Sequence, residues 1–254
     1  MKAVDAEHYV LEARLLRDKV PSFEQYPFSL DVIRKLDTIE FHPKVTFLVG
    51  ENGTGKSTLL EAIATAFGFN PEGGTKNFSF TTRASHSELH KYIRLVKSFR
   101  RPKDGFFLRA ESFYNVATNV DELDEQPGFG PPIKNSYGGK SLHHQSHGES
   151  FFSLMTHRFG GNGLYILDEP EAAMSPTRQM AMLTRMQQLI RQNSQLIIAT
   201  HSPIILAYPD SMILELINGE LVQVEYEQTE HYSITRDFLT SYEVFLKSLL
   251  DDED

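Results

Sequence analysis

The sequence predicts an α/β fold in which a central sheet is flanked by helices. Three short apolar runs, residues 45–49, 164–167 and 196–199, lack the polar alternation of a half-exposed strand, which is typical of strands inside a parallel sheet. Each run ends in glycine or polar residues. Because open α/β sheets bind ligands beyond the carboxyl ends of their strands, we expect these three ends to share one crevice.

The chain begins with a stretch that we expect to be helical, followed by a segment rich in proline and aromatic residues. The stretch is EHYVLEARLLRDK, residues 7–19, and the second segment extends to residue 30. We treat all 254 residues as one domain, because a content of 40% hydrophobic residues is enough to bury a sizeable core.

The strongest local signal is the glycine-rich stretch GENGTGKS, residues 50–57, between the first apolar run and a helix expected at 57–67. It fits the pattern G-x-x-x-x-G-K-[S/T] in the strand-loop-helix context of a phosphate-binding loop. Glycines let the backbone N–H groups and the helix start approach phosphates. An accidental match is the alternative, but it is expected in only about one chain of this length in a hundred.

This pattern assigns roles to particular residues. Lys56 is expected to reach the β- and γ-phosphates of a nucleotide, and Ser57 to ligate Mg²⁺. The candidate nucleotide-binding residues are Gly50, Glu51, Asn52, Gly53, Thr54, Gly55, Lys56, Ser57 and Thr58.

The region after the expected helix is less informative. Residues 71–86 are expected to be a loop. The stretch SELHKYIRLVKSFRRPKDG, residues 87–105, fits either a helix or, together with GFFLRA, a hairpin. It is also the most basic part of the chain, and we favour a solvated face over a patch for nucleic acid or an acidic partner.

The other two apolar runs end in residues suited to phosphate chemistry. Asp168 and Glu169 follow the second run, where one carboxylate can hold Mg²⁺ through water and the other can polarise an attacking water. His201 follows the third run and could hydrogen-bond a γ-phosphate or that water. The alternatives are a solvated acidic turn and a structural histidine, but all three strand ends are expected to converge.

The carboxyl-terminal part predicts a hairpin and a helix. In SMILELINGELVQVEYEQ, two apolar strands flank Asn218-Gly219, a strong turn signal. Residues 233–250 have apolar side chains at helical spacing and predict one terminal helix.

Three histidines, His143, His144 and His147, lie close together in SLHHQSHGESFF, residues 141–152. Their i,i+3 and i,i+4 spacings could place them on one helix face, which raises the alternative of a metal site. Neither an acidic general base nor a further ligand stands at metalloprotease spacing, so we do not favour this alternative.

Taken together, these motifs resemble those of the ATP-binding cassette (ABC) ATPases over residues 28–215. GENGTGKST is similar to the Walker A loop, LYILDEP to Walker B with Glu169 as the catalytic glutamate, and ATHS to the switch-histidine motif with its histidine at His201. The resemblance implies a P-loop NTPase fold with a mixed sheet, flanking helices and a small helical lobe at 112–150. It also implies an enzyme that hydrolyses ATP with Mg²⁺, with Glu169, His201 and Lys56 as catalytic residues.

The resemblance offers a second reading of the histidine-rich stretch. Residues 145–149, QSHGE, stand about twenty residues before Walker B, where the family places its signature sequence. Ser146 and Gly148 keep the positions that contact phosphate, and Glu149 replaces the usual glutamine. A hydroxyl and a bare N–H at a helix start form an anion site, which would close over ATP held by another subunit.

Other family positions depart from the pattern. The Q-loop glutamine is replaced by Glu111 or Ser112, and Glu111 is counted as a candidate metal ligand beside Ser57 and Asp168. Ser175 stands where many members place the D-loop aspartate. Phe23, Tyr26 and Phe28 are candidates for stacking on adenine and equally for the core.

Composition sets further bounds. The chain has no cysteine, which excludes a disulfide framework and a thiolate metal site. Acidic residues interrupt the amino-terminal stretch where a signal peptide would be apolar, and no run approaches 18 apolar residues, so we expect a cytoplasmic protein without a transmembrane segment. The net charge of −9 argues against a globally basic nucleic-acid binder.

The resemblance is greatest to small, stand-alone bacterial ATPases of the chromosome-maintenance, DNA-repair and defence-associated branch. It implies an ATP-dependent homodimer that acts as a switch in DNA repair or in a phage-defence or toxin-type complex, with an unidentified effector or partner. The alternatives are the ATP-binding subunit of a membrane ABC transporter and a nucleotide-gated sensor that barely turns over ATP.

Overall fold

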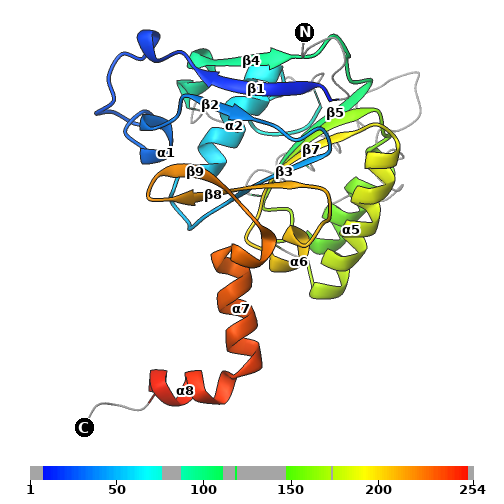
Figure 1. Ribbon diagram of the computed structural model, residues 1–254. Helices are drawn as coiled ribbons and strands as arrows, with labels where there is room; N and C mark the ends of the chain where they lie inside the picture. Colours follow the sequence, from blue (N-terminus) through cyan, green and yellow to red (C-terminus); the bar gives the residue numbers. More distant parts are fainter. Residues whose placement is uncertain (1–7, 76–86, 111–117, 119–146, 173, 251–254) are drawn as a thin grey trace.

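The computed structural model describes residues 8–75, 87–110, 118, 147–172 and 174–250 (Figure 1). Within these residues the chain forms two sheets with a long helix, α2 (Lys56–Phe67), between them. A second long helix, α5 (Pro176–Arg191), covers the opposite face of the larger sheet. Figure 1 shows this order of layers, with the smaller sheet at the top and α5 at the lower right.

The larger sheet has six strands in the order β5-β6-β7-β3-β8-β9. All neighbouring strands are parallel except β9, which runs antiparallel to β8, so the mixed α/β sheet expected from the sequence is confirmed. The strands are β3 (Val45–Val49), β5 (Asp104–Arg109), β6 (Gly163–Asp168), β7 (Gln195–Ala199), β8 (Met212–Ile217) and β9 (Glu220–Val224).

The three apolar runs of the sequence form three adjacent interior strands of this sheet, β6, β7 and β3. Every residue of β3, β6 and β7 is buried. Successive side chains of β3 point to opposite faces: Phe47 belongs to the apolar cluster on the α5 side, and Leu48 to the cluster around α2. The continuous apolar pattern therefore arises because both faces are covered.

The smaller sheet is antiparallel, with β1 (Val10–Leu15) between β2 (Thr38–Glu40) and β4 (Ile93–Lys97). The helix expected at residues 7–19 is thus wrong: the described part of this stretch is a strand followed by a short 3-10 helix at Arg17–Lys19. The register of β1 against β4 shifts between Val10 and Glu12, so the strict alternation that identifies a strand is broken. Pairing on both edges overrides the helical preference of the residues.

The basic stretch forms neither an α-helix nor a hairpin. A 3-10 helix at Glu88–Tyr92 leads into β4 of the smaller sheet, whereas β5 joins the larger sheet, so the two strands do not pair. Its basic side chains are exposed, as expected for a solvated face, at Lys91, Arg94, Lys97, Arg100, Arg101 and Lys103.

The remaining helices are mostly short. They are α1 (Asp31–Arg34), α4 (His147–Ser153) with a π-helical turn at Leu154–Arg158, α6 (Pro203–Leu206), a 3-10 turn at Tyr226–Gln228, α7 (Glu230–Thr240) and α8 (Tyr242–Leu250). None of the helices in the described ranges is long and apolar enough to cross a membrane. Apart from its last residues, 147–150 in α4, and residue 118, the helical lobe expected at 112–150 lies outside the described residues.

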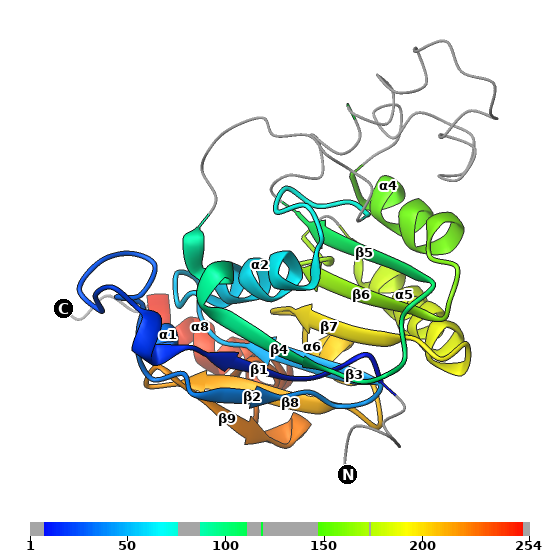
Figure 2. The same ribbon diagram turned by 90° about the horizontal axis from the view of Figure 1, so that it is seen from above.

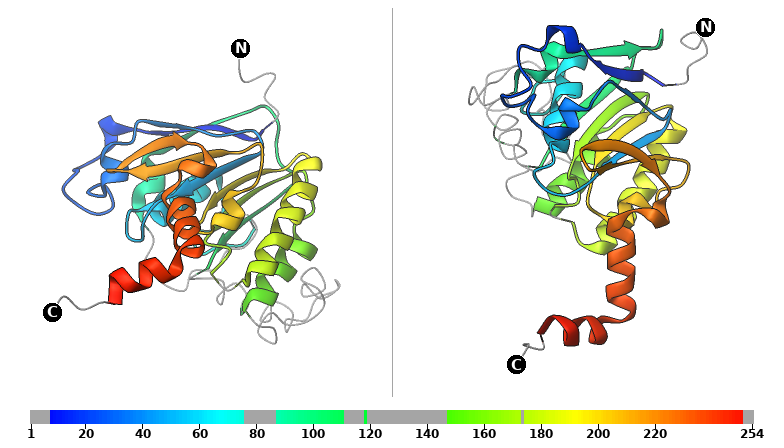
Figure 3. Two further views of the ribbon diagram at one scale, coloured as in Figure 1. Left: turned by 60° about the horizontal axis from the view of Figure 1, so that its bottom comes forward. Right: turned by 60° about the vertical axis from the view of Figure 1, so that its left-hand side comes forward.

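The β8–β9 hairpin is confirmed, and Asn218 and Gly219 both adopt the left-handed backbone conformation that a tight hairpin turn requires. The single terminal helix is instead two helices that meet at Ser241, whose carbonyl accepts hydrogen bonds from the first turn of α8. None of residues 230–250 is buried, and Figure 3 shows α7 and α8 projecting from the body as an arm.

Candidate functional site

The glycine-rich loop joins β3 to α2, as the sequence predicts. Gly50 and Gly55 have φ values of 149° and 96°, which side chains disfavour. A Cβ on Gly50 would lie 2.8 Å from Cβ of Leu216, and a Cβ on Gly55 would lie 2.9 Å from a methyl group of Val32. Both positions therefore require glycine, and the loop can wrap close to an anion.

Lys56 is almost fully buried, with 4% of its surface exposed, although it carries a charge. Its Nζ donates hydrogen bonds of 2.7 Å to the backbone oxygens of Gly50 and Glu51, so the ammonium group lies inside the loop. Burial lowers the pKa of Lys56, while the carboxylates of Glu169 and Asp168 oppose the shift. A bound phosphate would place a negatively charged group next to this ammonium group, which now donates to backbone oxygens.

Ser57 and Asp168 meet from different elements. Ser57 is in the first turn of α2, Asp168 is the last residue of β6, and the serine Oγ donates a 3.0 Å hydrogen bond to the aspartate Oδ1. Two hard oxygen ligands side by side fit Mg²⁺, which is usually held by one or two protein oxygens together with phosphates and water. Glu111, the third candidate ligand, lies outside the described residues, as does Ser112.

Glu169 adopts a left-handed conformation, with φ of 50°, which is uncommon for a residue other than glycine. Its N–H donates to the backbone oxygen of Ala199 on β7, which holds this turn at the carboxyl ends of β6 and β7. Its carboxylate is partly exposed, and one oxygen lies 3.6 Å from Nε2 of His201. The predicted catalytic carboxylate and the predicted switch histidine are therefore neighbours.

His201 is held through both its backbone and its ring. Its backbone N–H donates to Oε1 of Glu171 at 2.6 Å, and its Nδ1 is 2.9 Å from Nε2 of His231. Its own Nε2 makes no hydrogen bond within the described part of the chain. Burial, with the charge of Lys56 and the contact with His231, lowers the pKa of His201 to about 4, so the ring is neutral at pH 7.

Glu171 and His231 were not predicted from the sequence. Glu171 stands two residues after Glu169, so its place near the strand end is a signal that could have identified it. Burial raises the pKa of its carboxyl group. His231 comes from α7, thirty residues after His201, and no local pattern connects the two histidines.

The expected signature is described only in part. Ser146, His143 and His144 lie outside the described residues, and α4 begins at His147, so Gly148 is buried in its first turn. Figure 2 shows α4 beyond β5, far from β8 and β9. The described residues contain no group of three His, Cys, Asp or Glu side chains that could hold a metal ion.

Two residues near α4 have contacts that the sequence does not reveal. Glu149 forms an ion pair with Arg178 of α5, with an oxygen and a nitrogen 3.0 Å apart. Ser175 accepts a hydrogen bond from the N–H of Arg178 and caps α5, which accounts for a serine at the position of the D-loop aspartate.

The three candidate aromatic residues are not equivalent. Phe28 is buried and packs edge-on against Tyr92, and the guanidinium group of Arg17 lies over the ring of Phe23. Tyr26 is 65% exposed, and its hydroxyl is 3.4 Å from Oγ1 of Thr58 in α2. Of the three, Tyr26 therefore has a ring surface that a base could reach beside the loop.

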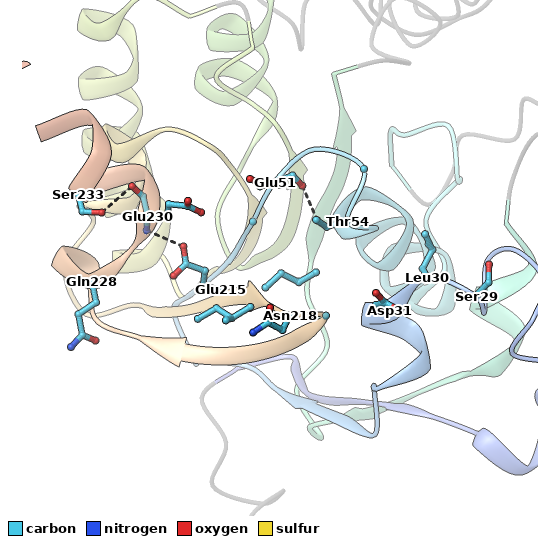
Figure 4. A pocket seen from close by; sticks show the side chains of 15 residues that line it. Ser29, Leu30, Asp31, Glu51, Thr54, Glu215, Asn218, Gln228, Glu230 and Ser233 are labelled. Atoms are coloured by element: carbon cyan, nitrogen blue, oxygen red, sulfur yellow. Dashed lines mark hydrogen bonds between the residues drawn. The ribbon is translucent and has the colours of Figure 1, made fainter. Parts of the chain in front are cut away.

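A cavity of about 830 Å³ opens beside the glycine-rich loop, between α1, the β8–β9 hairpin and the start of α7 (Figure 4). Its lining includes four carboxylates, Asp31, Glu51, Glu215 and Glu230. These would repel phosphates, so we expect a triphosphate to lie on the Lys56 side of the loop.

Comparisons with known proteins agree with this geometry. Residues 23–154, 132 of the 254, match a family described as an AAA domain. Residues 140–207 match a second AAA domain, described as a candidate AbiEii toxin of a type IV toxin–antitoxin system.

Two curated proteins and one solved structure illustrate the similarity. An uncharacterized ABC transporter ATP-binding protein of Haemophilus influenzae is 28% identical over 63% of this chain and 65% of its own length. ABC transporter G family member STR2 of Medicago truncatula is 25% identical over 66% of this chain and 25% of its own length. The chain therefore spans less than two thirds of either relative.

The solved structure is a dimeric bacterial ABC transporter cassette. It has a TM-score of 0.50 and 14% identity, covering 87% of this chain and 99% of the other. This likeness concerns the fold.

Proposed function

The chain belongs to the AAA-domain family and is a P-loop ATPase of the ABC type, and on this premise we propose that it is an ATP-driven dimerisation switch. Two copies would enclose ATP between them, and Mg²⁺-dependent hydrolysis would let them separate. The observation that carries the proposal is the convergence of three strand ends, where Lys56, the Ser57–Asp168 pair and the Glu169–His201 pair lie together.

Each of these residues has a role that follows from its surroundings. Lys56, whose ammonium group is buried in the loop, would exchange backbone oxygens for the β- and γ-phosphates. Ser57 and Asp168 would hold Mg²⁺, which neutralises phosphate charge when bound.

In the hydrolytic step, Glu169 would orient a water molecule and accept its proton as the oxygen bonds to the γ-phosphorus and the bond to ADP breaks. His201 is neutral at pH 7, and its Nε2 can donate to a γ-phosphate oxygen only in the tautomer that carries the proton there.

The pairing of two copies rests on the signature. We propose that Ser146 and Gly148 contact the γ-phosphate of ATP bound to the other copy. The position of Gly148 in the first turn of α4 supports this proposal, because the partial positive charge at a helix start favours an anion. Glu149, paired with Arg178, would stand at the rim of that contact.

For the cellular process we propose a phage-defence, toxin-type or DNA-repair complex with an effector protein. The match of residues 140–207 to the toxin–antitoxin family supports the toxin-type complex. The alternative is the ATP-binding subunit of a membrane transporter, which the name of the Haemophilus influenzae relative favours. Co-purification with a membrane permease would select the transporter, and with a nuclease or toxin the complex.

The variant Glu169→Gln tests the switch. It keeps the size of the side chain but cannot accept the proton, so we expect turnover to fall about 10²-fold or more. ATP should then accumulate uncleaved and hold two copies together, as measured by light scattering after size-exclusion chromatography in excess ATP. Glu227→Gln, at an exposed carboxylate, is the matched control. A Glu169→Gln protein that stays monomeric would contradict the switch.

Lys56→Ala tests the nucleotide site itself. Loss of the buried ammonium group should abolish ATP binding, measured by titration calorimetry. If the affinity for ATP were unchanged, the phosphate loop would be assigned to the wrong ligand.

A further inference from the structure

The contact between His201 and His231 joins the expected site of hydrolysis to the carboxyl-terminal arm. His231 is the second residue of α7, and its Nε2 lies 2.9 Å from Nδ1 of His201. The two rings are 5.0 Å apart between centroids and inclined by 49°, so they meet through their nitrogens and not as a parallel stack. None of the sequence motifs includes His231.

The backbone that carries His231 is fixed by contacts with the body of the protein. Thr229 is fully buried and caps α7, because its hydroxyl accepts a hydrogen bond from the N–H of Tyr232. The N–H of Glu230 donates a 3.0 Å hydrogen bond to Oε1 of Glu215, a buried residue of β8 (Figure 4). The base of α7 is therefore a built contact, although the rest of the arm is exposed.

The short distance between two neutral imidazoles allows one proton between them. Burial lowers the pKa of both histidines, so at neutral pH each ring carries a single N–H. If Nε2 of His231 donates, Nδ1 of His201 accepts and the proton of His201 must be on Nε2. In the opposite arrangement Nε2 of His201 carries only a lone pair, which would repel a phosphate oxygen.

Only the first arrangement serves the proposed role of His201. Its Nε2 is buried, lies 3.6 Å from a carboxylate oxygen of Glu169 and makes no hydrogen bond within the described residues, so none of these residues competes with a nucleotide for it. An N–H donor at Nε2 of His201 can stabilise charge on the γ-phosphate without reorganisation only if this tautomer is already fixed before ATP binds.

We propose that His231 is a positioning residue for ATP hydrolysis: its Nε2–H donates to Nδ1 of His201 and holds that ring with its own Nε2–H toward the γ-phosphate. This inference rests on the proposed function of His201. It also makes the base of α7 part of the ATP site, so a displacement of the arm would change the tautomer and orientation of the histidine.

The test compares His231→Leu, which removes the donor, with His231→Gln, whose amide can donate from a similar reach. Arg236→Gln, at an exposed position of the same helix, is the matched control. We expect kcat of the leucine variant to fall about tenfold, because the variant loses one hydrogen bond and the tautomer of His201 that this bond fixes. Its affinity for ATP should change less than about twofold. The glutamine variant should recover most of kcat.

A spectroscopic measurement separates positioning from folding. The ¹⁵N chemical shifts of labelled histidine distinguish the two tautomers, and His201 should be Nε2-protonated in the wild type and lose this preference in His231→Leu. Thermal unfolding of each variant shows whether it is folded. A leucine variant that is folded and keeps both the tautomer and kcat would overturn the proposal.

The double variant keeps this inference apart from the proposed function. If His231 acts through His201, then His231→Leu should lower kcat in the wild type but not further in a His201→Ala background. If His201→Ala itself leaves kcat unchanged, the proposed role of His201 fails. If His201→Ala lowers kcat and His231→Leu does not, only the role of His231 fails.

Discussion

Replacing Gln195 with methionine should destabilise the protein strongly, because this side chain ties the two sheets together. Gln195 is the first residue of β7 and is fully buried. Its Oε1 accepts hydrogen bonds of 3.0 Å from the N–H groups of Tyr9 and Val10, and its Nε2 donates to the backbone oxygens of Val10 at 2.9 Å and His42 at 3.2 Å.

The magnitude follows from the groups left behind. Methionine has a similar volume but leaves two buried N–H groups without an acceptor, each costing about 1–3 kcal/mol, and the added apolar burial offsets part of this. We expect a net loss of about 3 kcal/mol in the free energy of unfolding. For a chain of this size that corresponds to a decrease of about 6–12 °C in Tm.

Thermal unfolding followed by circular dichroism, without nucleotide, measures this loss. Gln223→Met is the matched control, because Gln223 is exposed on β9 and its substitution should change the free energy of unfolding by less than about 0.5 kcal/mol. If the two methionine variants unfolded at the same temperature, the side-chain amide of Gln195 would not be what joins the sheets.

Two further predictions concern buried charge. In the wild type, the half-buried guanidinium of Arg109 lies 2.5 Å from the carboxylate of Glu61. Glu61→Ala removes this partner and should lower the free energy of unfolding in urea by about 3 kcal/mol, whereas Glu61→Gln should lower it less. Equal losses in the two variants would contradict this prediction. Burial and the charge of Lys56 lower the pKa of His201 to about 4, so between pH 6.5 and pH 4 the unfolded chain binds a proton that the folded chain does not. The free energy of unfolding should therefore decrease as the pH is lowered from 6.5 to 4, and His201→Asn should reduce this slope in calorimetry; an unchanged slope would argue against the shift.

The sequence predicts the parts of the site that are local. The phosphate loop can be recognised because three glycines, Lys56 and Ser57 lie within eight consecutive residues, 50–57. The strand before it and the helix after it can each be predicted from the spacing of their apolar residues. Asp168 and Glu169 were identified for the same reason, since they follow a strand that is buried on both faces. Contacts such as the Ser57–Asp168 hydrogen bond follow from topology once parallel strands are assumed.

Elements whose conformation depends on distant partners could not be predicted in this way. The stretch around β1 has helix-forming residues and a broken alternation, and it becomes a strand because two other strands pair with it. The terminal helix divides at Ser241, because a serine can cap a helix as well as continue one. The residues around Ser241 are exposed, so packing against the body of the protein does not favour one continuous helix.

Short patterns of neighbouring residues are enough to predict the three buried strands, the β8–β9 hairpin, the phosphate loop and the residue types at the three strand ends. Contacts between distant parts of the chain, which no local pattern contains, place Gln195 between the two sheets and bring Glu171 and His231 to His201. A buried polar side chain must find its hydrogen-bond partner wherever the fold places one, and no pattern in the 29 residues between His201 and His231 indicates that pairing.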